Sequence, residues 1–111
     1  MGQAALPTRE TIARKLASSL EEVADRLGSA ASVAEFVAAL DDNRLVWEGL
    51  RHAVGRYGWS VPARQMAFAL DSSARARAGL SDHDVEAMIA LNRRTSSALR
   101  ADDAEALSRA S

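Results

Sequence analysis

Apolar residues recur at steps of three and four along most of this chain, and this spacing constrains its fold more than any other feature. It places apolar side chains on one face of a helix, whereas a strand needs alternation at every second residue, of which no useful run occurs. The sequence therefore predicts an all-α fold, a small bundle of about four helices with short connectors. We expect a single helical domain over residues 8–100, after a flexible N-terminus (1–7) and before a C-terminal tail (101–111) that frays.

Residues typical of helix ends predict where the first two helices lie. Thr8 is the expected N-cap of the first helix, and Gly28 is expected to end it. Ser32 is expected to begin the second helix, with Glu35 three positions later completing a capping box. Gly58 is expected to end that second helix.

The same signals predict two further helices. Pro62 suits the first turn of a third helix, which Gly79 is expected to terminate. Ser81 is expected to begin the fourth helix, with Asp84 completing its capping box. The apolar stripes expected for the second and third helices are Val33, Phe36, Val37, Leu40, Trp47, Leu50, Val54 and Tyr57, and Met66, Ala67, Leu70 and Ala74.

Two asparagines lie on otherwise apolar stripes. Asn43 falls between Leu40 and Trp47 at steps of three and four, and Asn92 lies on the fourth stripe, which ends at Leu99. A buried amide without a partner costs about 1–3 kcal/mol, so both positions need an explanation. Either the two amides bond each other or a helix end and fix the helix register, or they clamp the backbone of a partner helix.

An arginine follows each asparagine, and these pairs carry a resemblance to a known family. Residues 40–50, LDDNRLVWEGL, resemble the Asn-Arg-x-Leu-Trp helix of the bacterial flagellar protein FlaF family. Residues 88–99, MIALNRRTSSAL, resemble that family's closing Leu-Ile-x-Ile-Asn-Arg stretch. Residues 61–64 stand where the family has Leu-Pro, so the resemblance covers roughly residues 8–99. Val46 replaces the usual Leu, and Ala98 stands where Gly is common.

The resemblance implies a cytoplasmic protein that binds flagellin and supports its synthesis and export together with the regulator FlbT. A helical module with an apolar groove would cover the amphipathic terminal segments of unassembled flagellin by helix-in-groove contacts. The candidate partner-binding or motif residues are Asn43, Arg44, Trp47, Trp59, Asn92 and Arg93. Aromatic side chains often anchor interfaces, and Trp59, which is off the second stripe, is the better candidate because Trp47 is expected in the core.

Other classes of function have less support in the sequence. The only histidines, His52 and His83, lie far apart, and no catalytic, phosphate-binding or metal-binding motif appears, so we expect no enzyme and no cofactor. A nucleic-acid binder is disfavoured by a net charge of −1 and by acidic residues at the start of the fourth helix. A homodimeric structural adaptor remains an alternative, and the oligomeric state stays open. Lacking a long apolar run or a secretory signal, the chain is expected in the cytoplasm.

Overall fold

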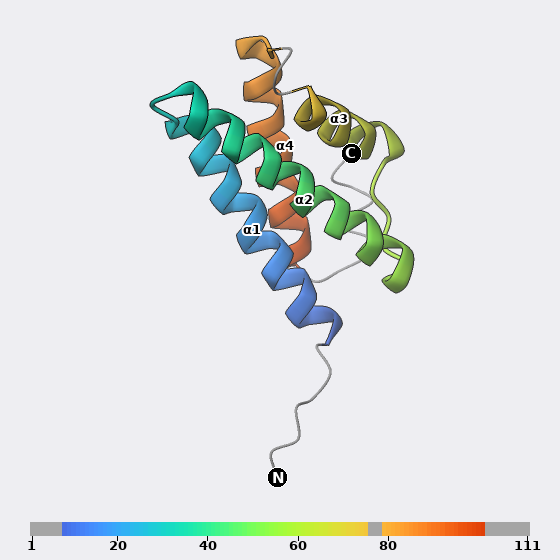
Figure 1. Ribbon diagram of the computed structural model, residues 1–111. Helices are drawn as coiled ribbons and strands as arrows, with labels where there is room; N and C mark the ends of the chain where they lie inside the picture. Colours follow the sequence, from blue (N-terminus) through green and yellow to red (C-terminus); the bar gives the residue numbers. More distant parts are fainter. Residues whose placement is uncertain (1–7, 76–78, 102–111) are drawn as a thin grey trace.

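The computed structural model describes residues 8–75 and 79–101, and this part of the chain consists of helices and short connectors. The helices are α1 (Arg9–Ser29), α2 (Val33–Tyr57), α3 (Ala63–Ala74) and α4 (Asp82–Arg100) (Figure 1). The prediction of a small all-α bundle is therefore confirmed. The expectations for residues 1–7 and for the tail beyond Ala101 lie outside the described residues.

The helices do not contribute equally to the bundle. α1 and α2 form an antiparallel pair, and α1 packs most extensively against α4, which crosses behind that pair (Figure 1). The shorter helix α3 lies on α2 and approaches α4 at only a few positions. The backbones of α2 and α4 do not come close to each other, so side chains alone must fill the space between them.

The predicted N-caps are confirmed at three helices. The hydroxyl oxygens of Thr8, Ser32 and Ser81 each accept a hydrogen bond from the backbone N–H three residues later, at 3.1 Å in all three cases. At α2 the Glu35 carboxylate also accepts from a backbone N–H, but from that of Ala31 and not from the cap itself. These bonds satisfy amides that have no partner within the helix, so each start is encoded locally.

The helix ends follow the sequence less closely. Gly58 ends α2 as predicted, in the left-handed conformation (φ 70°) with its N–H bonded to Val54 O at 3.0 Å. Gly28 does not end α1, which continues through it to Ser29. The chain leaves the helix only at Ala30, where ψ is 126°, so glycine at position 28 keeps a helical backbone and needs no left-handed turn.

The stripe predicted for α3 is only half right: Met66 and Leu70 pack against the core, but Ala67 and Ala74 do not. The exposed residues of α3 include Ala67 and Ala74, whereas Ala69, Ser72 and Ser73 are the ones buried. Ser73 faces inward because its hydroxyl is hydrogen-bonded in the core, as described below. Ser72 is buried beside it without a hydrogen-bond partner for its hydroxyl among the described residues. Gly79 (φ 86°) does not terminate α3, which ends at Ala74.

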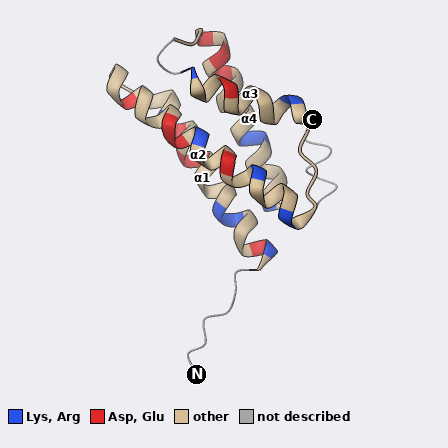
Figure 2. Ribbon diagram, turned by 45° about the vertical axis from the view of Figure 1, so that its right-hand side comes forward, with Lys and Arg blue, Asp and Glu red and all other residues tan. Residues whose placement is uncertain are grey.

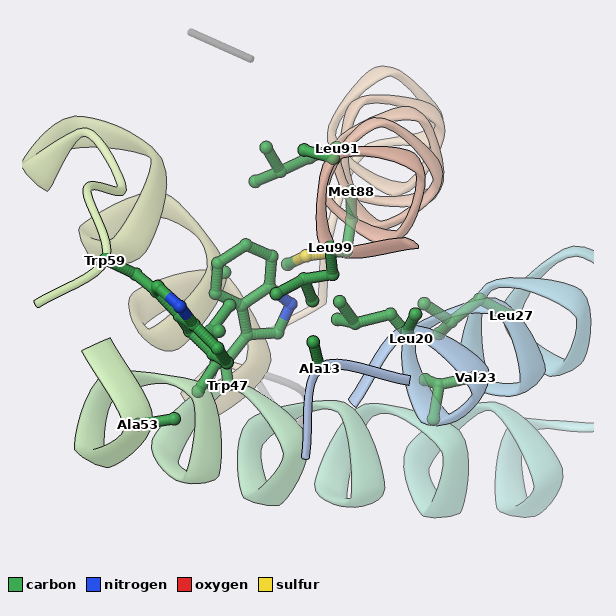
Figure 3. Close-up of a cluster of buried hydrophobic side chains, with 14 of the residues drawn as sticks. Ala13, Leu20, Val23, Leu27, Trp47, Ala53, Trp59, Met88, Leu91 and Leu99 are labelled. Atoms are coloured by element: carbon green, nitrogen blue, oxygen red, sulfur yellow. The ribbon is translucent and has the colours of Figure 1, made fainter. Parts of the chain in front are cut away.

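Trp47 lies at the centre of the core and is fully buried. Figure 3 shows its indole extending from α2 toward Met88 and Leu99 of α4, across the space that the two backbones leave open. Val33, expected on the α2 stripe, is instead 79% exposed because it precedes the part of α2 that packs. Among the described residues, no helix combines the length and apolar character that crossing a membrane requires.

Candidate functional site

The two asparagines singled out in the sequence meet in the core. The Asn92 side-chain N–H₂ donates to the Asn43 amide oxygen at 2.7 Å, and both side chains are 0% exposed. The Trp47 indole N–H donates to the Asn92 amide oxygen at 2.9 Å. The Asn92 amide nitrogen also lies 3.4 Å from the backbone oxygen of Leu20 in α1. We call the group Trp47, Asn92, Asn43 and Ser73 the amide network.

The amide network continues from Asn43 into α3. The Asn43 amide nitrogen donates to Ser73 Oγ at 2.8 Å and lies 3.2 Å from Met88 Sδ. Ser73 Oγ in turn donates to the backbone oxygen of Ala69 at 2.6 Å. One chain of buried hydrogen bonds therefore touches all four helices and links α2 to α4, whose backbones stay apart.

The donor-to-acceptor direction of this series of hydrogen bonds is fixed by the groups at its two ends. An indole N–H can only donate, so it must meet the amide oxygen of Asn92, not its nitrogen. The nitrogen then faces Asn43 Oδ1, which leaves the Asn43 nitrogen to donate to Ser73. Ser73 can pass its own hydrogen to Ala69 O because a carbonyl only accepts. Each amide therefore has one arrangement that satisfies its neighbours.

These contacts agree with the structural alternative for the asparagines. Each amide is satisfied from within the chain and has no surface to offer, so clamping a partner helix would require the bundle to open. Inside a low-dielectric core, breaking such a network would leave polar groups without water, at high cost. Asn43, Trp47 and Asn92 therefore act on each other and not on an external partner in this conformation.

The two arginines that follow the asparagines lie on the surface. Arg44 pairs within α2 with Glu48 at 3.2 Å, one helical turn away. Arg93 joins α4 to α1 through Asp25 at 3.0 Å. The Arg93–Asp25 pair is exposed and the Arg44–Glu48 pair is half-buried, and solvent screening limits each to about 1 kcal/mol of stabilisation.

Trp59, the better candidate for a partner contact, is not on the surface. It is only 5% exposed and packs against the core from the connector between α2 and α3. Its ring lies 5.2 Å from that of Tyr57, and the Arg9 guanidinium lies 5.7 Å from its centre. A position off the α2 stripe does not expose Trp59, because a connector residue can turn back into the core. Trp47 is buried as expected.

A polar cluster that the sequence analysis missed joins the C-terminal half of α4 to α1. Arg100 donates to both carboxylate oxygens of Glu21, at 2.7 and 3.2 Å, and to Ser18 Oγ at 3.1 Å. Ser96 also donates to the Glu21 carboxylate. The hydrogen bond from Arg100, followed by that from Ser96, lowers the pKa of Glu21 from 4.5 to about 2. Spacing within either helix gives no signal for this contact, because its partners are 79 residues apart.

Two surface grooves flank opposite faces of α4. The first, the α3–α4 groove, has a volume of about 200 Å³ and is lined by Arg64, Gln65, Phe68, Ala87, Leu91 and Arg94. The second, the α1–α4 groove, has a volume of about 380 Å³ and is lined by Leu27, Gly28, Asp82, Val85, Glu86 and Ile89. Both have apolar floors, but the first carries arginines and the second carboxylates. The resemblance to the FlaF family implied an apolar groove but gave no location for it.

Other kinds of site have little support in the described residues. His52 and His83 are both exposed, on α2 and α4. Across residues 8–75 and 79–101, no three His, Asp or Glu side chains gather as they would around a metal ion. Comparison with protein-family models, curated proteins and solved structures finds no match to this chain.

Proposed function

We propose that this chain is a non-enzymatic helical adaptor that binds flagellin in the cytoplasm and promotes its synthesis and secretion, acting with FlbT. One observation carries the proposal: Asn43, Trp47 and Asn92, which carry the resemblance to the FlaF family, are hydrogen-bonded to one another. Residues from two separate motifs thus form one structural unit. A chain sharing both motifs at this spacing has a physical reason to share this bundle.

The surface of the bundle suits contact with a helical partner. Unassembled flagellin has amphipathic terminal segments whose apolar faces stay uncovered until they pack in the filament. A groove with an apolar floor beside α4 would cover such a face by helix-in-groove contacts. Covering it would prevent premature assembly and keep the subunit competent for secretion. An effect on flagellin synthesis would then be indirect, with FlbT as the component that regulates translation.

Direct binding to nucleic acid is less well supported. Figure 2 shows acidic as well as basic residues along the helices. The formal net charge of −1 gives no attractive field for a phosphate backbone. The start of α4 carries Asp82, Asp84 and Glu86, which would repel phosphates where a recognition helix meets DNA.

The test is light scattering of the purified chain alone, flagellin alone and their mixture at low flagellin concentration. We expect a discrete complex, and we expect flagellin lacking its terminal segments not to form it. A tight homodimer that ignores flagellin would contradict the proposal and favour a structural adaptor. Salt-dependent retention of the flagellin messenger leader by the chain alone, in filter binding, would favour a nucleic-acid binder.

A further inference from the structure

We propose that the α3–α4 groove is the docking site for an acidic amphipathic helix, one that presents a large apolar side chain with carboxylates within a helical turn of it. The inference deepens the proposed function, on which it rests for the identity of the partner, since flagellin would supply the helix. The groove exists because α3 packs on α2 and meets α4 at only a few positions. Its walls therefore belong to two helices that are not closely packed against each other.

The size of the groove fits one side chain of a partner. A volume of about 200 Å³ is small for a metabolite site, which usually exceeds about 300 Å³. It is ample for one aromatic or branched aliphatic side chain, since an apolar cavity of about 150 Å³ accommodates benzene. Phe68 from α3 and Ala87 and Leu91 from α4 provide the apolar floor. This arrangement fits an anchor residue projecting from a helix.

The charge of the groove specifies what surrounds that anchor. Arg64 lies one turn before Phe68 on α3, and Arg94 lies one turn after Leu91 on α4, so each places a guanidinium beside the floor. Both arginines are exposed, and neither pairs with a carboxylate among residues 8–75 and 79–101. Four other arginines in that part of the chain pair with carboxylates (Arg26, Arg44, Arg93 and Arg100), whereas the exposed Arg14 and Arg51 do not. The groove is therefore distinguished by two such arginines lying beside one apolar floor.

The residues that line the two grooves favour the α3–α4 groove over the α1–α4 groove as the docking site. Aromatic side chains and arginine are enriched where proteins bind one another, while Asp and Glu are depleted. The α3–α4 groove combines Phe68 with Arg64 and Arg94, whereas the larger groove carries Asp82 and Glu86. Arginine also bonds a carboxylate through two parallel N–H groups, which gives the contact orientation as well as charge.

The direct test uses a synthetic helical peptide with one leucine flanked by glutamates at positions −4 and +3, and a matched peptide with lysines in their place. We expect the glutamate peptide to bind and to shift the amide NMR signals of Phe68 and Leu91. The variant R64E/R94E should weaken this binding by about tenfold or more. The control variant R14E/R51E reverses two exposed arginines outside the groove and should bind as the wild type does. The proposal would be overturned if R64E/R94E bound the glutamate peptide as tightly as the wild type does, or if the wild type bound the lysine peptide equally well. It would also be overturned if the wild type bound neither peptide, or if single-stranded RNA displaced the bound peptide.

A second arm, with flagellin as the ligand, separates this inference from the proposed function. Loss of flagellin binding in R64E/R94E but not in R14E/R51E supports both. Flagellin binding that is unchanged in R64E/R94E overturns the groove assignment and leaves the proposed function standing. Failure of the wild type to bind flagellin, with the glutamate peptide still bound in the groove, overturns the proposed function and leaves the groove assignment standing. Circular dichroism of each variant confirms that the bundle is intact.

Discussion

Two polar residues only two positions apart on α4 have opposite surroundings. Asn92 is fully buried and its amide is satisfied by Trp47, Asn43 and the Leu20 carbonyl. Arg94 is exposed at the rim of the α3–α4 groove. The comparison separates two uses of polarity in one helix. The amide network holds the four helices in register, and the groove keeps polar groups available to a partner, so changes to the first should affect stability and changes to the second should affect binding.

The largest expected effect is that of Asn92→Leu, which replaces the central amide by an apolar side chain of similar size. The Trp47 N–H and the Asn43 amide oxygen then lose their partners in a dry core. We expect the free energy of unfolding to fall by about 3 kcal/mol, since each unsatisfied buried group costs about 1–3 kcal/mol. Urea denaturation followed by circular dichroism measures the change, which is large for a bundle of this size.

A matched measurement sharpens this prediction. In the double variant Asn43→Leu/Asn92→Leu both amides are removed, so the loss should be smaller than the sum of the two single losses. Additive losses would show that the two amides do not interact energetically. Binding of the glutamate peptide to folded Asn92→Leu should match the wild type. Lost binding in a variant of undiminished stability would place Asn92 at the partner surface and break the comparison.

A smaller effect on stability is expected from Glu21→Gln. The folded-state pKa of Glu21 is lowered from 4.5 to about 2, so the carboxylate stabilises the fold above about pH 4.5. That contribution disappears as the pH falls through about 2, where Glu21 is protonated in both states. Because its side chain is 41% exposed, solvent screening reduces the contribution to about 1 kcal/mol or less.

Denaturation of both proteins between about pH 7 and pH 2 checks this sign. The wild type should have the higher free energy of unfolding at neutral pH, and this difference from Glu21→Gln should shrink on acidification and vanish near pH 2. Raising the salt concentration at neutral pH should also reduce the difference. A difference that grows on acidification would mean that the Arg100 contact does not stabilise the carboxylate.

The sequence predicted best those features that residues close in the chain determine. The three N-caps and the end of α2 at Gly58 depend on bonds spanning three or four residues, and the spacing of apolar residues correctly predicted all four helices. Periodicity also placed Asn43 and Asn92 on inward faces. It could not decide between the two alternatives for them, because the partners of each amide lie on other helices.

Features that depend on tertiary packing were predicted poorly. The buried face of α3 carries Ser72 and Ser73, and a stripe defined by apolar residues excludes serines by construction. Ser73 is buried because Asn43, thirty positions earlier, donates to it. Trp59 turns inward from a connector that has no periodicity to interpret. Arg64 and Arg94 line one groove only because α3, packed on α2, approaches α4 at a few positions, which nothing in either helix specifies.

The smallest expected effect on stability belongs to the change with the largest expected effect on binding, R64E/R94E. Neither arginine pairs with a carboxylate within residues 8–75 and 79–101, so reversing both removes no ion pair found there. The free energy of unfolding should stay within about 0.5 kcal/mol of the wild type, as is usual for surface changes. Urea denaturation measures the free energy of unfolding of R64E/R94E, of the wild type and of the control R14E/R51E, which changes the net charge by the same amount. A loss specific to R64E/R94E would mean that these arginines hold α3 to α4, and the groove would then be part of the fold and not a surface kept for a partner.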